Sequence, residues 1–368
     1  MTARSMARTW GLTVVIVGAA IVLVEGVSSL VMFAGRLATE QERAPSGDRA
    51  HIQYDSALGW TGKPGVTLRD FYGPGLSVQT NAQGFRDTVD FTRAAPPGRS
   101  RVICSGDSFT FGYGVGNDQS WCALLPVFDS RLPALNLGLV GYGVDQSYLL
   151  YRRVGNVYGH RVVCFAFITD DFLRMQRTSF LGNGKPRLVL HGGTLTIENV
   201  PVPRPRPAPR WIARTGEAVA ELRTAQLLAA IRHQLSRRSP ATSSEMDPAV
   251  WSVAEHVFGD LQALTAANGA TLLLIYLPTI EDYAGHGADW WRGHVREAAR
   301  QHGWSYLDLV DAMRSLPADS VGALFLPTGQ DPLRSPRLGH LSAAGHRWVA
   351  RRVSARLAAS PSNVARLP

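Results

Sequence analysis

A serine preceded by glycine and aspartate, in Gly106-Asp107-Ser108, is the residue of this chain best suited to nucleophilic chemistry. It follows the apolar segment 101–105, whose residues are typical of a buried β-strand. Open α/β sheets build their sites at the carboxyl ends of such strands, which makes the Ser108 hydroxyl a candidate nucleophile. The neighbouring glycines do not have the spacing of a G-x-S-x-G elbow. A serine that caps a helix would look the same, so the segment alone leaves both interpretations open.

A serine nucleophile requires a base, and His340 is the best candidate in the sequence. It lies directly before a helix that the pattern predicts from about Ser342. A histidine in such a loop can point back over the edge of a sheet, although a surface histidine would show the same sequence. His346 falls inside the predicted helix, where we expect it to pack or to cap.

Two further segments end predicted strands in residues that favour chemistry. The segment 136–143 is rich in glycine, and Gly141 and its neighbours allow backbone N–H groups to approach a ligand closely. The segment Thr169-Asp170-Asp171 follows the apolar run 161–168. An aspartate that caps the next helix would explain this last segment equally well.

The elements that must position these residues alternate between strands and helices from residue 101 onward. Such alternation predicts an α/β fold with a parallel sheet covered by helices on both faces. The predicted strands are 101–105, 134–138, 161–168, 270–277 and 304–309, and the predicted helices are 119–130, 145–155, 249–267, 287–302 and 342–358.

Residues 176–245 interrupt this rhythm, and we interpret them as an insertion beside the site. They contain a predicted hairpin about Gly192-Gly193 and a proline-rich stretch. A basic amphipathic helix is predicted over about 211–237, followed by a linker rich in Ser, Pro and Thr.

The N-terminal segment predicts a membrane anchor. Arg4 and Arg8 precede an apolar stretch over about 11–33, which is long enough to span a bilayer. Few positive charges follow it closely, so the positive-inside rule places residues 1–10 in the cytoplasm and the rest of the chain outside. A cleaved signal peptide is the alternative to this uncleaved signal anchor. Glu25 interrupts the apolar run, and we expect it near the outer interface, protonated, or against a partner helix.

The remaining segments divide by composition. Residues 34–50 are polar and predict a tether, whereas residues 51–100 combine glycine and proline with short apolar runs and predict a small β-rich lead-in. The α/β domain is expected over residues 101–358, and residues 359–368 form a tail.

Charge and cysteine usage limit the partners. The net charge of +9 comes almost entirely from arginine and is compatible with a membrane surface or an anionic polymer. The arginines are scattered without a nucleic-acid-binding motif, so nucleic acid is not expected. Cys104, Cys122 and Cys164 lack the spacings of zinc ligands, and we predict no metal and no cofactor. Their apolar surroundings favour buried thiols; a Cys104–Cys164 disulfide would require neighbouring strands.

Taken in order, the strand-end segments resemble those of the SGNH hydrolases, also called GDSL esterases and lipases. Residues 106–112 are similar to the first block of that family. Gly141 matches the glycine of the second block, residues 169–171 resemble the third, and His340 matches the base. The resemblance covers about residues 100–358 and implies a flavodoxin-like, three-layer α/β/α fold.

The resemblance also extends to segments outside the blocks. Residues 58–60 and 81–87 are similar to the lead-in of bacterial, membrane-anchored envelope members of the superfamily. Lys185-Pro186-Arg187, together with the proline-rich run 200–203, is similar to their insertion.

This chain departs from the family pattern at two positions. The third block of the family carries an asparagine that donates to the oxyanion, and Asp170 stands there instead. Asp170 would help only if protonated, and Thr169 is an alternative donor beside the backbone N–H groups of Ser108 and Gly141. The family usually places an aspartate three residues before the base, where this chain has arginine. Asp331 is then the nearest candidate for the orienting acid, and a Ser–His dyad is the alternative.

These features together predict a serine esterase anchored in a bacterial cell membrane, with its catalytic domain in the periplasm or otherwise outside the cytoplasm. Ser108 would attack an acyl ester, and His340 would accept its proton and return it to the leaving alcohol. The expected substrate is an acylated carbohydrate or small ester, with polysaccharide deacetylation as the natural reaction. Two alternatives stay open: an O-acyltransferase that modifies an envelope or exported polysaccharide, and a non-catalytic envelope scaffold with a degenerate site.

Overall fold

The computed structural model describes residues 3–39, 50–180, 182–204, 224, 228, 247–327 and 339–359. The chain divides into two compact units. The first comprises residues 1–42 and 206–243, and the second comprises residues 43–205 and 244–368. The site lies in the second unit.

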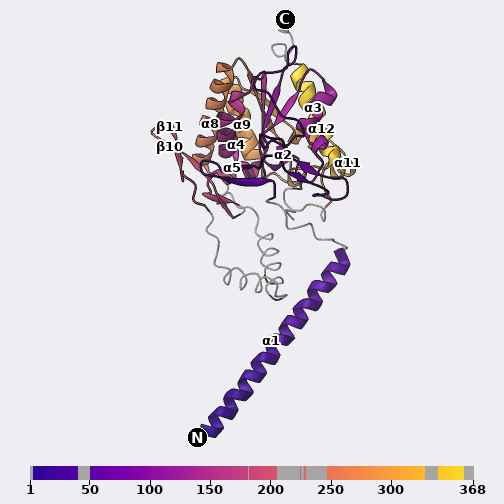
Figure 1. Cartoon of the computed structure of the whole chain (residues 1–368), viewed down its shortest axis with the longest axis vertical. Helices are drawn as coiled ribbons and strands as arrows, with labels where there is room; N and C mark the ends of the chain where they lie inside the picture. The colour runs from indigo at the N-terminus through magenta and orange to yellow at the C-terminus, as the bar shows by residue number, and fades with distance from the viewer. Residues whose placement is uncertain are drawn as a thin grey trace. The chain divides into compact units, whose positions relative to one another are not determined.

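The core of the second unit is a parallel sheet of five strands (Figure 1). Numbered along the chain, the strands lie in the order 2-1-3-4-5, which is the flavodoxin-like arrangement, so the predicted fold class is confirmed. The chain order reverses between β5 and β7, and ligands of such sheets bind at the carboxyl ends beside that point. The strands are β5 (Val102–Ser105), β6 (Ala134–Asn136), β7 (Val162–Phe167), β12 (Thr271–Tyr276) and β13 (Ser305–Asp308).

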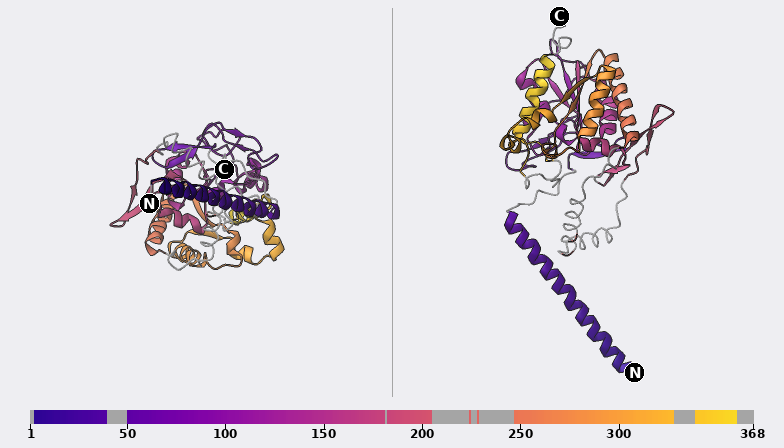
Figure 2. Two further views of the ribbon diagram at one scale, coloured as in Figure 1. Left: turned by 90° about the horizontal axis from the view of Figure 1, so that it is seen from below. Right: turned by 180° about the vertical axis from the view of Figure 1, so that it is seen from behind.

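Helices cover both faces of this sheet (Figures 1 and 2). Alternate residues of a strand point to opposite faces. Cys104 and Cys164 therefore pack with α3 and α12, whereas Ile103 and Val163 pack with α4, α8 and α9. The predicted helices and strands of this domain are confirmed to within a few residues at each end. The helices are α3 (Trp121–Phe128), α4 (Val144–Arg153), α8 (Pro248–Ala267), α9 (Asp289–His302) and α12 (Ala343–Ala358).

Shorter elements surround the carboxyl edge of the sheet. The helices are α2 (Ser108–Phe111), α5 (Thr169–Met175), α10 (Val310–Arg314) and α11 (Ala318–Ala323), with single 3₁₀ turns at Asn117–Gln119, Gly155–Val157 and Ile280–Asp282. The antiparallel strand pairs are β1 (Ile52–Asp55) with β2 (Gly59–Gly62), β3 (Thr67–Leu68) with β4 (Val78–Gln79), β8 (Ser179–Phe180) with β9 (Asn183–Gly184), and β10 (Arg187–His191) with β11 (Thr194–Glu198).

The lead-in packs against the glycine-rich segment that follows β6. The indole Nε1 of Trp60 donates to the carbonyl of Val140 at 3.1 Å, and the hydroxyl of Tyr142 donates to the carbonyl of Trp60. Trp60 and Tyr142 are both buried, so these bonds are shielded from water. The lead-in thus supports the loop that carries Gly141.

A buried arginine of the lead-in, Arg86, binds the carboxyl end of α2, the helix that begins at Ser108. Arg86 donates to the carbonyl of Phe111 at 2.7 Å and also to the carbonyls of Gly112 and Val115. These carbonyls lie at and beyond the end of α2, where a helix leaves its last acceptors unpaired. Arg86 therefore satisfies acceptors that the short helix cannot satisfy itself.

The described part of the insertion is joined to the sheet domain by a buried ion pair. The Nζ of Lys185 lies 2.6 Å from the carboxylate of Asp145 on α4, and both side chains are fully buried. The predicted hairpin about Gly192-Gly193 is confirmed as β10 and β11. The basic helix predicted over about 211–237 falls outside the described residues, except for Thr224 and Leu228.

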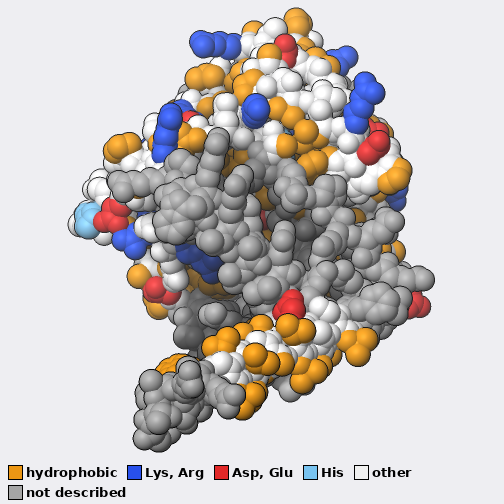
Figure 3. All heavy atoms as spheres, turned by 60° about the horizontal axis from the view of Figure 1, so that its bottom comes forward, with side chains coloured by type: hydrophobic (Ala, Val, Ile, Leu, Met, Phe, Trp, Pro, Cys, Tyr) orange, Lys and Arg blue, Asp and Glu red, His pale blue; other side chains and the backbone are white. Residues whose placement is uncertain are grey.

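The first unit contains the long helix α1 (Ala3–Thr39), whose residues Trp10–Val31 are apolar and long enough to cross a membrane. Hydrophobic side chains spread over its surface (Figure 3). Glu25 has a partner within this unit, because its carboxylate accepts hydrogen bonds from the backbone N–H and the hydroxyl of Thr224, at 3.0 Å and 2.5 Å.

The expectation that the cysteines are free thiols is wrong for two of them. Cys104 on β5 forms a disulfide with Cys122 on α3, and their Cα atoms lie 6.1 Å apart. The Cys104–Cys164 pairing is also wrong, although these residues are register partners on neighbouring strands. α3 packs on the face of β5 to which Cys104 points. The Cα separation of Cys104 and Cys122 therefore falls within the range that disulfides require. Such bonds persist in oxidising compartments, which favours an extracytoplasmic location for this domain.

Candidate active site

The candidate nucleophile Ser108 is placed by the turn that ends β5. A Cβ on Gly106 would lie 2.5 Å from the carbonyl oxygen of Ala166, so only glycine allows β5 and β7 to approach at this turn. Asp107 then caps α2 by accepting a hydrogen bond from the N–H of Phe109 at 2.8 Å. Since the cap is Asp107, the alternative in which Ser108 serves as the N-cap is wrong. The Ser108 hydroxyl is therefore not engaged in capping.

The candidate base His340 reaches this serine. Its Nε2 lies 3.0 Å from the Oγ of Ser108, across 232 residues of sequence. Ser108 Oγ also lies 3.2 Å from the Oδ2 of Asp107. A neutral imidazole that accepts the hydroxyl proton at Nε2 is the arrangement that activates a serine for attack.

The loop around His340 is held by neighbouring backbone. The N–H of Leu326 donates to the carbonyl of His340 at 2.8 Å, and Ser342 caps α12 by accepting from the N–H of Gly345 at 3.1 Å. The rings of Phe109 and Tyr113 lie 4.9 Å and 4.8 Å from the imidazole. Ser108 and His340 are 2 % and 1 % exposed, so the pair is largely shielded from bulk water.

His346 packs and does not belong to the pair. Its Nδ1 accepts a hydrogen bond from the N–H of Trp121 at 3.2 Å, at the start of α3. Burial, followed by the charges of Arg86 and His340, lowers the pKa of His346 to about 3. The ring is therefore neutral in the physiological range, as an acceptor at Nδ1 requires.

Gly141 lies in a loop that is bonded directly to the serine turn. Its φ of +82° falls in the left-handed region, which favours glycine. Two residues earlier, the N–H of Leu139 donates to the carbonyl of Gly106 at 3.1 Å, and this bond brings the loop beside Ser108. The backbone N–H groups of Ser108 and Gly141 are the expected oxyanion donors.

The third strand-end segment begins α5, at the carboxyl end of β7. The hydroxyl of Thr169 lies 2.8 Å from that of Tyr276, so it already has a partner on β12. Asp170 is half-buried, whereas Asp171 is buried and accepts a hydrogen bond from the N–H of Ile168 at 3.1 Å. Two adjacent aspartates thus occupy different environments on one helical turn.

Arg174 links all three segments, although its sequence context did not mark it as a site residue. One nitrogen, Nη1, lies 3.1 Å from Oδ2 of Asp107, 2.5 Å from Oδ1 of Asp171 and 2.9 Å from the carbonyl oxygen of Tyr142. Arg174 is 5 % exposed. The only sequence signal is the three-residue spacing from Asp171, which pairs side chains on a helix.

The buried charges of this cluster act on one another. Burial, then the nearby charge of Asp107, raises the pKa of Asp171 well above its usual range, although Arg174 opposes this. Burial acts to lower the pKa of Arg174, but the charges of Asp171 and Asp107 outweigh it and raise that pKa. The guanidinium stays charged between the two carboxyl groups.

The remaining candidate, Asp331, falls outside the described residues, so the orienting acid stays a prediction. Among the described residues, no group of three or more His, Cys, Asp or Glu side chains has the arrangement of a metal site.

No family model and no curated protein matches the chain. Among solved structures, it is similar to a lipolytic protein of the G-D-S-L family from Desulfitobacterium hafniense, at 15 % identity and a TM-score of 0.39 over 70 % of this chain and 100 % of the other. A G-D-S-L family protein from Veillonella parvula is similar at 13 % identity and a TM-score of 0.41, over 71 % of this chain and 100 % of the other. An acetylxylan esterase from Geobacillus stearothermophilus is similar at 13 % identity and a TM-score of 0.40, over 71 % of this chain and 95 % of the other. The TM-scores of these three similarities are all below 0.5.

Proposed function

We propose that this chain is a membrane-anchored, extracytoplasmic serine esterase. The observation that carries the proposal is the 3.0 Å contact between Ser108 Oγ and His340 Nε2 at the carboxyl edge of the sheet. Ser108 attacks the acyl carbonyl and His340 accepts its proton. The N–H groups of Ser108 and Gly141 stabilise the oxyanion, and the ester bond breaks as His340 protonates the leaving alcohol. A water molecule, deprotonated by His340, then attacks the acyl-serine ester, which releases the carboxylic acid and restores the Ser108 hydroxyl. An acylated carbohydrate is the substrate class we infer, from the predicted location outside the cytoplasm and from the resemblance to the SGNH hydrolases.

The test is hydrolysis of p-nitrophenyl acetate by the full chain in detergent. Ser108→Ala is expected to lower kcat/KM by at least about 1,000-fold, because the nucleophile is lost. Ser105→Ala is a matched control: Ser105 is a buried serine three residues away, whose hydroxyl donates to the carbonyl of Ser147 at 3.1 Å. Equal rates for the wild type and Ser108→Ala would contradict the esterase and favour the non-catalytic scaffold.

Asp170→Asn tests the departure in the third segment with the same assay. An amide donates a hydrogen bond where a carboxylate cannot, so the variant is expected to raise kcat by about 10-fold or more. A fall in kcat would mean that the acid form of Asp170 is the donor in the wild type.

An O-acyltransferase is a second candidate, favoured by the near-complete burial of Ser108 and His340. A shielded acyl-enzyme is protected from hydrolysis by water, so that a sugar hydroxyl can accept the acyl group first. Acetyl transfer to an added oligosaccharide, faster than release of acetate and absent in Ser108→Ala, would establish it. Release of acetate at a rate that no oligosaccharide changes would support the hydrolase instead.

A further inference from the structure

We propose that Arg174 is the positioning residue of this site, and that its guanidinium holds the serine turn, the glycine loop and the third segment in register. The inference rests on the proposed function, because it assigns to Arg174 the alignment of the oxyanion donors of the esterase. It concerns a side chain that touches neither substrate nor reacting atoms.

The three acceptors of Arg174 Nη1 belong to three different segments. Asp107 belongs to the turn after β5, Tyr142 to the loop after β6, and Asp171 to the helix after β7. Each segment supplies, or directly adjoins, an expected contributor to the oxyanion site. Tyr142 follows Gly141 directly, and the bond to its carbonyl fixes the second peptide unit after the one that contains the Gly141 N–H. A single nitrogen therefore fixes three segments that the chain joins only through long connections.

Arg174 also acts on the charge of Asp107, beside the nucleophile. Oδ2 of Asp107 lies 3.2 Å from Ser108 Oγ, and the same oxygen is bound by Arg174 at 3.1 Å. An uncompensated carboxylate there would repel the negative charge that develops during attack, and the low local dielectric strengthens that repulsion. Arg174 compensates this charge through its ion pair with the same oxygen.

No second cation in the described part of the chain duplicates this role. Within the described residues, Asp107 and Asp171 form ion pairs with Arg174 alone. Lys185, the nearby buried lysine, is paired with Asp145 and donates to the carbonyl of Arg174 at 3.1 Å. Removal of the guanidinium would therefore leave two buried carboxyl groups without an opposite charge.

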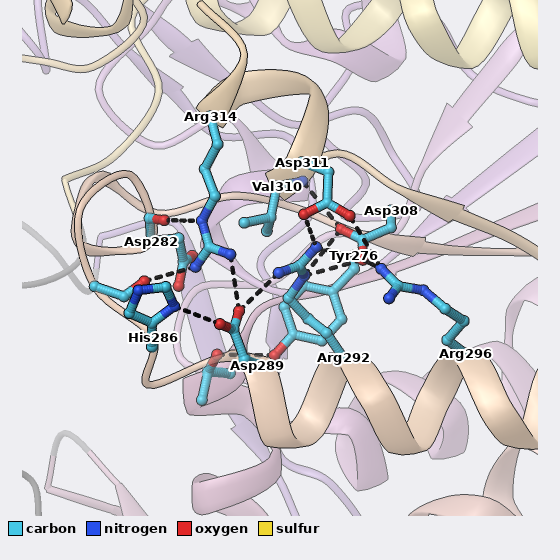
Figure 4. Close-up of polar contacts among 12 residues, drawn as sticks. Tyr276, Asp282, His286, Asp289, Arg292, Arg296, Asp308, Val310, Asp311 and Arg314 are labelled. Atoms are coloured by element: carbon cyan, nitrogen blue, oxygen red, sulfur yellow. Dashed lines mark hydrogen bonds and ion pairs between the residues drawn. The ribbon is translucent and has the colours of Figure 1, made fainter.

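A second arginine offers a matched control, because it is equally buried and binds aspartates that do not contact the site. Figure 4 shows Arg292, Arg296 and Arg314 directed toward a group of aspartates at β13, α9 and α10. Arg292 is 4 % exposed and binds Asp289, Asp308 and Asp311. Among the described residues, the side-chain bonds of Arg292 go to these three aspartates and not to the serine turn or the glycine loop.

The experiment compares Arg174→Met, Arg174→Lys and Arg292→Met in the full chain in detergent. The concentration of reactive Ser108 is titrated to completion with a fluorophosphonate, so that kcat refers to folded, reactive protein only. Arg174→Met is expected to lower this kcat about 100-fold with little change in KM, as for the loss of an oxyanion donor. The kcat of Arg174→Lys is expected to lie between those of Arg174→Met and the wild type, because the ammonium of lysine is charged but lacks the planar fork of the guanidinium. Arg292→Met is expected to stay within about twofold of the wild type.

Hydrogen exchange measured by mass spectrometry provides a readout that needs no activity. Arg174→Met and Arg174→Lys are expected to accelerate exchange in peptides covering residues 106–113 and 137–146, and Arg292→Met is not. Unchanged exchange there, or a kcat per reactive serine equal to that of the wild type in both Arg174 variants, would overturn the positioning role. An inactive wild type whose Arg174 variants still loosen these peptides would instead contradict the esterase and leave the positioning role intact.

Discussion

Two buried arginines bind aspartates in this domain, yet their surroundings differ. Arg174 contacts Asp107 and Asp171, whose side chains are 0 % and 2 % exposed. The carboxylates bound by Arg292 reach the surface to increasing degrees: Asp308 is 10 %, Asp289 38 % and Asp311 61 % exposed. One cluster is sealed and the other is open to water.

The clusters also differ in redundancy. Asp308 is bound by Arg296 as well as Arg292, and Asp289 by Arg314 as well. In the sealed cluster, Arg174 is the single cation that binds the two aspartates among the residues that the structure describes. Water and a second arginine can compensate for the loss of Arg292, whereas neither can replace Arg174. A sealed, non-redundant cluster suits a site whose groups must not move.

The largest expected effect comes from removing the cation of the sealed cluster. Arg174→Met is expected to lower the free energy of unfolding by about 3–5 kcal/mol, because two buried carboxyl groups lose their compensating charge. Arg292→Met is expected to lower it by about 1–2 kcal/mol, since its partners keep other hydrogen bonds. Urea unfolding of the full chain in detergent, followed by tryptophan fluorescence, measures both.

Adding Asp171→Leu to Arg174→Met sharpens this comparison. It removes one of the two unpaired carboxyl groups and should restore part of the lost stability. Equal losses in Arg174→Met and Arg292→Met would show that burial of the carboxylates does not distinguish the clusters.

The dependence of stability on pH is the next effect, and its sign should differ between the clusters. Burial and then the charge of Asp107 raise the pKa of Asp171, so the folded protein retains a proton that the unfolded chain releases above the ordinary value of 3.8. Its contribution to the free energy of unfolding therefore declines as the pH rises above 3.8. For Asp311, burial acts to raise the pKa, but the hydrogen bond and charge of Arg292 outweigh it and lower that pKa. Its contribution is present above 3.8 and is lost as the pH falls through the lowered value.

Unfolding of the wild type, Asp171→Asn and Asp311→Asn between pH 3 and pH 8 tests these signs. The stability difference between wild type and Asp171→Asn should shrink as the pH rises, and that between wild type and Asp311→Asn should grow. Parallel curves for the two differences would refute the contrast.

The smallest expected effect lies at the exposed rim of the open cluster. Arg296 is 55 % exposed, and exposed ion pairs contribute little because water and salt screen them. Arg296→Ala should change the free energy of unfolding by less than about 1 kcal/mol and leave esterase activity unchanged. A larger loss would mean that the open cluster acts as one unit through its outermost arginine.

Local sequence patterns were enough to predict most of the fold. Most strands of the sheet are short apolar runs, and the covering helices have apolar residues three and four apart. Both patterns can be recognised in the sequence without knowing which residues are neighbours in space. The flavodoxin-like order of the strands was implied only by the resemblance of the strand-end segments, because local periodicity does not tell which strands are neighbours. The disulfide was mispredicted because it depends on which helix packs above Cys104, and the sequence of α3 does not contain that information.

The candidate site divides in the same way. Ser108, Gly141 and His340 lie at strand or helix ends that the sequence marks with glycine and polar residues. Arg174 carries no such mark: it lies inside a helix, as many surface arginines do. Its importance arises only when three strand ends meet around it.

The sequence by itself determined the α/β fold, the apolar N-terminal helix and the candidate pair of Ser108 and His340, because hydrophobic period, strand ends and helix starts are local properties. Only the tertiary structure decided that Asp107 caps α2, that Cys104 pairs with Cys122, and that Arg174 joins three segments. Each of these depends on the distance between atoms far apart in the chain, and that distance exists only once the sheet has assembled and its carboxyl edge has been sealed from water.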